Sequence, residues 1–116
     1  MSAATLHTRA AGPATVLTLD GKVRAQDLPG LKSTVERAAA MPGGCLIVLD
    51  CSALRSIDST AIGFLISSFK AVCAGGRDFA IANLGPEALE ALRVTGLSAI
   101  LPIHDTLDAA LGAGRS

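Results

Sequence analysis

Three small polar side chains, Asp58, Ser59 and Thr60, stand together where an apolar segment gives way to a helical pattern. Any of them can cap a helix, because its side-chain oxygen accepts a hydrogen bond from a free N–H group of the first turn. A phosphate on Ser59 would also be stabilised by those N–H groups and by the positive end of the helix dipole. It would place roughly two negative charges beside Asp58 and so repel a docked acidic or apolar partner. The residues therefore favour two interpretations, a helix cap or a phosphorylation switch.

A third interpretation makes Ser59 a catalytic nucleophile at a strand-to-helix turn. The G-x-S-x-G pattern of such turns is absent, because Ile57 and Ala61 occupy the glycine positions. A general base would have to be His7 or His104, and the sequence offers neither an evident orienting partner. We therefore expect that the protein is not an enzyme.

Length and composition limit the remaining classes of function. The 116 residues are enough for one domain with a core and too few for two. Ten basic residues balance ten acidic ones, and three phenylalanines stand without Trp or Tyr, so direct nucleic-acid binding is not expected. No apolar run approaches the ~20 residues of a membrane span, and the first residues lack a signal-peptide core. These features predict a cytoplasmic protein without membrane insertion.

The scattered cysteines and histidines predict no metal site and no cofactor. Without CxxC spacing, the odd number of cysteines indicates reduced, buried thiols that act as small hydrophobes. They are Cys45, Cys51 and Cys73. The glycine pairs at 43–44 and 75–76 match no phosphate-binding loop and indicate helix ends. Arg77 and Arg93 are expected to be solvated charges.

The elements that position residues 58–60 follow from hydrophobic periodicity. The apolar run 45–50 predicts a central strand that is covered on both faces. After residue 60, apolar residues recur at helical spacing and predict a helix that ends at Gly75 and Gly76. The expected buried stripe of this helix is Ile62, Leu65, Ile66, Phe69, Val72 and Cys73.

Other elements are predicted on both sides of this central unit. Before it we expect strands at 5–9 and 15–20 and a helix that Asp27 caps, with its inner stripe at Leu28, Leu31, Val35 and Ala38. After it we expect a strand at 78–82, a helix from Pro86 with Leu89, Leu92 and Val94 inward, an edge strand at 99–103, and a short helix capped by Asp105. The alternation predicts an α/β fold with a mostly parallel sheet of four to five strands and about four helices.

The run from Ile47 to Val72 resembles the signature of the STAS domain, specifically that of bacterial anti-sigma factor antagonists. That family has an apolar strand ending in aspartate, a short turn, then Asp-Ser-Ser/Thr-Gly-hydrophobic-Gly and a helix. The DFAIAN strand, the Pro86 helix and the stop at 95–97 also fall where the family has equivalents. The resemblance thus covers essentially the whole chain and implies a single STAS domain over 1–116, with a frayed tail at 112–116.

The resemblance also implies a function. Members of this family are not enzymes. They bind an anti-sigma factor, itself a serine kinase of the ATPase type, and so free a sigma factor for transcription. The kinase phosphorylates the serine after the motif aspartate, here Ser59, and the phosphorylated form releases the kinase. A metal-dependent serine phosphatase restores binding. Asp58, Ser59, Thr60 and Ala61 would lie in the partner-binding surface.

Two departures from the family pattern bear on partner choice. The family often has Gly-Glu-Leu-Asp after the second strand, whereas this chain has Lys22 and Arg24 at the acidic positions, and Ala61 replaces the usual glycine. Because rim charges set partner choice, we expect Lys22 and Arg24 to meet an acidic patch on a divergent kinase. The alternative is an unswitched STAS module, such as a stressosome-like scaffold or an accessory subunit of a lipid or anion transport complex. In that case Ser59 or Thr60 would be structural.

Overall fold

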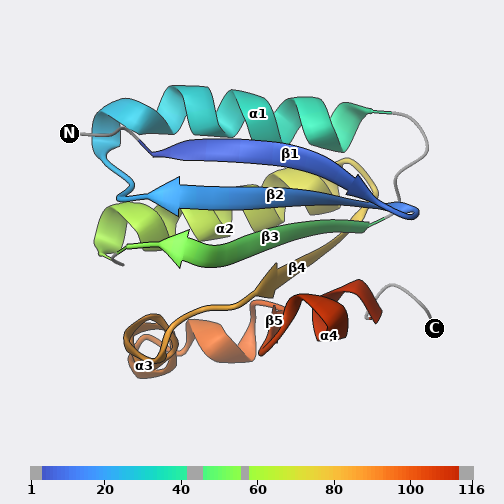
Figure 1. The fold of residues 1–116 in the computed structure, drawn as a ribbon. Helices are drawn as coiled ribbons and strands as arrows, with labels where there is room; N and C mark the ends of the chain where they lie inside the picture. The colour runs from blue at the N-terminus through green and yellow to red at the C-terminus, as the bar shows by residue number, and fades with distance from the viewer. Residues whose placement is uncertain (1–3, 42–45, 56–57, 113–116) are drawn as a thin grey trace.

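A computed structural model describes residues 4–41, 46–55 and 58–112. These residues form one five-stranded sheet with helices packed against it (Figure 1). The strands are β1 (Thr5–Ala11), β2 (Ala14–Gly21), β3 (Leu46–Leu54), β4 (Asp78–Ala82) and β5 (Ile103–His104). The α-helices are α1 (Leu28–Ala40), α2 (Ser59–Ala74), α3 (Pro86–Val94) and α4 (Leu107–Gly112), with short 3-10 turns at Ala25–Asp27 and Leu97–Ala99.

The strands follow one another across the sheet in chain order. β1 and β2 form an antiparallel hairpin around a tight turn at Gly12 and Pro13, where Gly12 has a φ of 62° that suits glycine. β2, β3, β4 and β5 are parallel to one another. The mostly parallel α/β fold predicted from the alternation of strands and helices is thus confirmed. Because the chain returns through helices, the carboxyl ends of β2, β3 and β4 meet at one edge of the sheet.

The sheet separates two hydrophobic clusters of different size. The larger one lies between the sheet and α1, α2 and α3, and includes Leu17, Leu19, Leu49, Phe64 and Leu92. The smaller one lies on the opposite face, where the buried Ala110 of α4 packs with Val16, Val48, Ala80 and Ala82, among others. Residues of β3 therefore enter both clusters. The expectation of a central strand covered on both faces is confirmed.

Two of the expected strands have different limits. β3 continues to Leu54, beyond the predicted end at residue 50, because Ala53 and Leu54 still pair with Asp20 and Gly21 of β2. The edge strand predicted at 99–103 is present, but it is limited to Ile103–His104, so the predicted bounds are wrong. Gly96, with a φ of 79°, turns the chain into the 3-10 turn, which leaves only Ile103–His104 to pair with β4.

Asp27 was predicted to cap α1 and Asp105 to cap α4, and both predictions are wrong. The 3-10 turn runs directly into α1, so Asp27 already has helical backbone angles and its side chain does not cap the helix. Its Oδ2 instead accepts hydrogen bonds from the backbone N–H groups of Arg24 at 3.1 Å and Ala4 at 3.4 Å. At α4, Thr106 Oγ1 accepts the bond from Ala109 N at 3.1 Å, in the place expected for Asp105.

The inner faces of the helices are partly as predicted. Leu31, Val35 and Ala38 of α1 are buried as expected. In α3, Leu92 is buried, but Val94 is 77% exposed and the expectation for it is wrong. The stripe expected on α2 is displaced: its buried residues are Ala61, Phe64, Leu65, Ser68 and Val72.

The side chains of Cys73 and Arg77 also differ from expectation. Cys73 is exposed and Cys51 is buried, whereas Cys45 lies outside the described residues. Arg77 is half-buried and donates hydrogen bonds to the carbonyl oxygens of Ala39 and Met41. It thereby ties the end of α1 to the start of β4 and is not simply a solvated charge. Arg93 is exposed, as predicted, and its Nη2 lies 2.8 Å from an oxygen of Glu90.

Candidate functional site

The loops after β2 and β3 and the start of α2, which carry the predicted site residues, lie at the edge where the parallel strands end. In Figure 1 the arrowheads of β2 and β3 point to the same side of the molecule, where α2 begins. Lys22 follows β2 directly and Arg55 follows β3 directly. The backbone N–H of Arg55 donates to the carbonyl oxygen of Gly21 at 2.9 Å, so these two loops are joined. The carboxyl edge of an open parallel sheet is the usual place for a binding site.

Asp58 provides the cap of α2. Its backbone is extended, with φ −136° and ψ −172°, and its Oδ1 accepts a hydrogen bond from the N–H of Ala61 at 3.0 Å. The carbonyl oxygen of Asp58 accepts the first helical bond, from Ile62 N at 2.9 Å. A carboxylate at this position also suits the positive end of the helix dipole. The capping interpretation therefore holds for Asp58.

Ser59 is the first residue of α2 and is exposed. Since Asp58 provides the cap, the Ser59 hydroxyl is not needed to close the helix. Thr60 is half-buried, and Ala61 is only 1% exposed, with its side chain in the larger core cluster. Of the four residues expected at the helix start, Asp58 and Ser59 are exposed, and the side chain of Ala61 is not available to a partner.

The two cations that depart from the family pattern differ in their surroundings. Lys22 is exposed on the loop after β2. Arg24 is half-buried, and its backbone N–H is bound to Asp27. The exposed Arg55 on the adjoining loop brings a third cation to this edge. Sequence reasoning missed Arg55, because the predicted strand ended at residue 50 and Arg55 follows the strand directly only in the structure.

A groove of about 320 Å³ opens beside Arg55, between the end of β3 and the start of α3. Its lining is mainly apolar and comes from residues that the sequence does not bring together. These are Cys51, Leu54, Arg55 and the segment Gly85 to Ala88. The groove extends the carboxyl edge from the loop after β3 to the start of α3.

Asp50, within β3, fixes this strand relative to the end of β4. Its carboxylate is only 7% exposed, and Oδ1 accepts hydrogen bonds from Ser52 N and from Asn83 Nδ2, both at 3.0 Å. Asn83 adopts a left-handed backbone, with φ 62°, which asparagine tolerates better than most residues. Burial of a carboxylate is acceptable here because it has these two partners. The loop that leads from β4 to α3 is thereby held close to β3.

Burial and the neighbouring Asp50 carboxylate raise the pKa of the Cys51 thiol from its ordinary value of 9.0 to about 12. The unfolded chain therefore loses this proton near pH 9, while the folded protein keeps it until near pH 12. We expect the free energy of unfolding to fall as pH rises through this window, by at most about 1.4 kcal/mol per pH unit. Denaturant titrations across the window measure the slope. The Cys51→Ala variant should have a shallower slope, and equal slopes would contradict the assignment.

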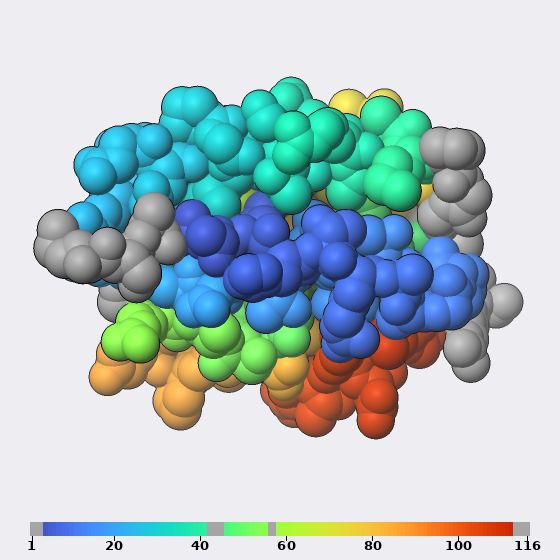
Figure 2. Space-filling view, turned by 45° about the horizontal axis from the view of Figure 1, so that its top comes forward, coloured from blue at the N-terminus to red at the C-terminus, as the bar shows by residue number. Residues whose placement is uncertain are grey.

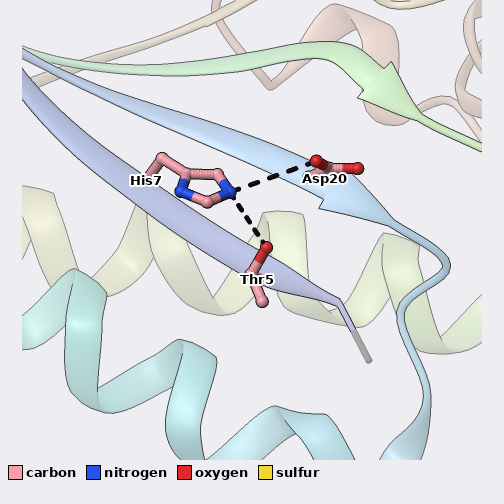
Figure 3. Close-up of polar contacts among 3 residues, drawn as sticks. All are labelled: Thr5, His7 and Asp20. Carbon is pink, nitrogen blue, oxygen red and sulfur yellow. Dashed lines mark hydrogen bonds and ion pairs between the residues drawn. The ribbon is translucent and has the colours of Figure 1, made fainter. Parts of the chain in front are cut away.

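The histidines occupy separate strands. His7 on β1 is exposed, with Nε2 3.2 Å from Thr5 Oγ1 and 4.0 Å from Asp20 Oδ2 (Figure 3). A carboxylate thus does lie near His7, contrary to expectation. His104 is half-buried on β5. Across residues 4–41, 46–55 and 58–112, no three His, Cys, Asp or Glu side chains gather as a metal site would require. Within the same ranges, no helix has the length and apolar character needed to cross a membrane.

The sheet order and the capped helix start at its carboxyl edge define the class of protein, a small α/β domain with an exposed serine at that edge. A family model described as the STAS domain matches residues 5–110. The chain therefore belongs to the STAS domain family. The resemblance read from the sequence is thereby confirmed at the level of the family and its fold.

Solved structures share this fold at low sequence identity. An anti-sigma factor antagonist from Mycobacterium paratuberculosis is 23% identical, with a TM-score of 0.84 over 97% of this chain and 95% of that one. An anti-sigma-factor antagonist (STAS) domain protein from Planctomyces limnophilus is 21% identical, with a TM-score of 0.81 over 97% and 99%. The Bacillus cell fate determinant SpoIIAA in its phosphorylated form is 16% identical, with a TM-score of 0.71 over 96% and 100%. A comparison with curated proteins returned no match.

Proposed function

We propose that this protein is an anti-sigma factor antagonist that is switched by phosphorylation of Ser59. In the unphosphorylated state it binds an anti-sigma factor that is also a serine kinase, and so frees a sigma factor in the cytoplasm. Phosphorylation of Ser59 releases the kinase, and a metal-dependent serine phosphatase restores binding. The observation that carries the proposal is the exposed Ser59 hydroxyl at the start of a helix that Asp58 already caps.

The helix start explains how phosphate could change binding and spare the fold. The Asp58–Ala61 hydrogen bond does not involve Ser59, so modification of Ser59 leaves the cap in place. A phosphate would meet the partial positive charge of the α2 N-terminus, which tolerates anions. Its roughly two negative charges would nevertheless lie beside the exposed Asp58 and alter the surface that the partner contacts. The phosphorylated form known for SpoIIAA, a protein of the same fold, supports a switch of this kind.

The cations at the carboxyl edge support an acidic partner surface. Lys22 and Arg55 lie on loops joined by the Gly21–Arg55 hydrogen bond, and both side chains are exposed. Charges of one sign at the rim of an interface mainly steer association and choose between partners. The kinase that recognises this protein would therefore present acidic residues opposite these loops.

Changing Lys22 to glutamate should weaken binding to the cognate kinase, because it places a like charge against the acidic surface. For an exposed rim charge we expect a loss of about tenfold at low salt that shrinks as ionic strength rises. Surface plasmon resonance at two salt concentrations measures both effects. Lys32→Glu is the matched control, since Lys32 is exposed on α1. Equal losses of kinase affinity in the two variants, or no loss in Lys22→Glu, would contradict the proposal that the kinase presents an acidic surface.

The phosphorylation assay decides between the switch and the unswitched scaffold. The protein is incubated with the candidate kinase and ATP, and any phosphate is mapped by mass spectrometry. Phosphate on Ser59 together with loss of kinase binding supports the proposal. An unmodified protein that binds no kinase and co-purifies with transporter or stressosome components would support the scaffold interpretation. Hydrolysis of a generic ester that disappears in Ser59→Ala would favour an enzyme.

A further inference from the structure

The free edge of β1 borders a groove beside α1. Among the described residues β1 pairs only with β2, so its other edge is open. The groove has a volume of about 400 Å³ and lies between the start of β1 and the start of α1. Its lining residues are Ala4, Thr5, Leu6, Gln26, Asp27, Gly30, Leu31 and Thr34. In the space-filling view β1 lies uncovered at the front, with α1 running alongside it (Figure 2).

The backbone of β1 directs a row of polar groups into this space. In a two-residue hairpin the flanking residues, here Ala11 and Ala14, form a hydrogen-bonded pair, and such pairs alternate along the ladder. Counting back from Ala11, the odd-numbered residues face β2, and Leu6, Thr8 and Ala10 direct their N–H and C=O groups to the open edge. The N–H of Ala4 is next in this row, and it donates to Asp27 Oδ2 at 3.4 Å. That bond shows an outward N–H of this edge meeting an acceptor on the α1 side.

The edge lacks several of the features that prevent strand addition, although it carries one exposed cation, Arg9. β1 has seven residues and contains no proline and no lysine, and its register with β2 is regular along its length. Gly30 also keeps the groove open. Its backbone is not left-handed, and a Cβ built there meets nothing within 4 Å, so neither conformation nor packing requires glycine. Glycine lowers helix stability relative to alanine. Here the missing side chain leaves space in the groove between α1 and β1.

We propose that β1 and α1 form a docking site for an extended segment of a partner protein, which adds to the sheet as a sixth strand beside β1. Main-chain hydrogen bonds to the open edge would supply the affinity, and side chains on alternate positions would pack between Leu6 and Gly30. Next to Leu6, on the border of the larger core cluster, and the buried Leu31, these side chains would be apolar. The rest of the groove wall is polar, with Gln26, Asp27 and Thr34. On the opposite face the exposed Arg9 favours an acidic residue in the added strand. The site does not depend on the proposed switch at Ser59.

A second copy of the protein fits this edge less well than a lone segment. Antiparallel pairing of two β1 edges would place both α1 helices on the same face of the joined sheet. Each α1 borders the free edge of its own β1 (Figure 1). The two helices would therefore occupy the same strip above the new pair of strands. An extended segment without a helix of its own avoids this conflict.

The test is a selection of phage-displayed random eight-residue peptides against the 116-residue protein. The enriched peptide is synthesised, its affinity is measured by fluorescence anisotropy, and its contacts are mapped by amide chemical shifts. We expect alternating apolar and polar positions with an acidic residue among the polar ones, and shifts at Leu6, Thr8, Ala10 and Gly30. The Gly30→Phe variant fills the groove and should weaken binding at least about tenfold. Ser33→Phe, on the exposed face of the same helix, should bind as the parent does.

Three outcomes would overturn the docking site. They are the absence of any enriched peptide, shifts confined to other elements, and equal affinities for the Gly30→Phe and Ser33→Phe variants. Sedimentation of the free protein as a dimer that Gly30→Phe dissociates would replace the partner segment by a second copy and would also refute the proposal. Shift mapping on the parent protein keeps the test decisive if a variant folds poorly.

Discussion

Replacing Ser59 by alanine should abolish phosphorylation by the partner kinase and leave binding to that kinase intact. The alanine removes the hydroxyl that accepts phosphate, while the Asp58–Ala61 hydrogen bond continues to cap α2. Because Ser59 is exposed, we expect the free energy of unfolding to change by no more than about 0.5 kcal/mol. Radioactive phosphate incorporation, kinase pull-down and thermal unfolding measure the three parts of this expectation.

Glutamate at position 59 should imitate phosphate only in part. It adds one negative charge where phosphate adds about two, and it lacks the third acceptor oxygen. We therefore expect Ser59→Glu to bind the kinase more weakly than the parent protein and more tightly than the phosphorylated protein. Thr60→Ala is the matched control, since the half-buried Thr60 is the neighbouring hydroxyl. Phosphate that maps to Thr60, or persists in Ser59→Ala, would assign the switch to another residue.

The part of the site that sequence could predict is the part formed by contiguous residues. Asp58, Ser59 and Thr60 follow one another, and the rules for helix starts predict their local geometry without tertiary structure. The groove beside Arg55 depends instead on β3 and the start of α3, which are some thirty residues apart in sequence. The proximity of Arg55 to Lys22 likewise depends on the pairing of β2 with β3. Such neighbours become visible only when strand order and register are known.

The errors in helix caps have a common physical origin. Asp27 and Asp105 each precede a helix, and either carboxylate could cap it in isolation. Asp27 is instead in a helical turn that directs its carboxylate back to Arg24 and Ala4, a partner 23 residues away. At α4 the next residue, Thr106, makes the capping bond. The preference for aspartate near a helix start therefore predicts that a helix begins there, but it does not predict which side-chain oxygen caps the helix.

The buried face of α2 was displaced because many of its residues are apolar. Periodicity gave little contrast between the predicted stripe, which contains Ile66 and Cys73, and the observed one, which contains Phe64 and Ser68. The sheet and α1 pack against the face of α2 that contains Phe64 and Ser68, as the burial of these residues shows. Ser68 is 2% exposed, and its buried Oγ has no hydrogen-bond partner among the described residues, so no hydrophobicity rule would place it inward.

Truncating Phe64 to alanine should therefore cost about 3–5 kcal/mol of stability, because a fully buried ring would leave a cavity in the larger core cluster. That is a large share of the roughly 5–15 kcal/mol that stabilises a domain of this kind. Ile66→Ala, at a half-buried position of the stripe predicted from sequence, should cost less than half as much. Chemical denaturation of the two variants measures the difference directly. A larger loss in Ile66→Ala would mean that α2 presents the other face to the sheet.

The Phe64 variants also separate stability from recognition. Phe64 lies a little more than one turn after Ser59 in α2, but its side chain is buried, so it should not contact a partner at the surface. Phe64→Leu keeps most of the apolar volume and should remain folded, with a loss of about 1 kcal/mol. Well below its melting temperature this variant should bind the kinase and accept phosphate as the parent does. Unchanged stability with impaired phosphorylation would instead show that Phe64 helps to set the position of the Ser59 hydroxyl at the helix start.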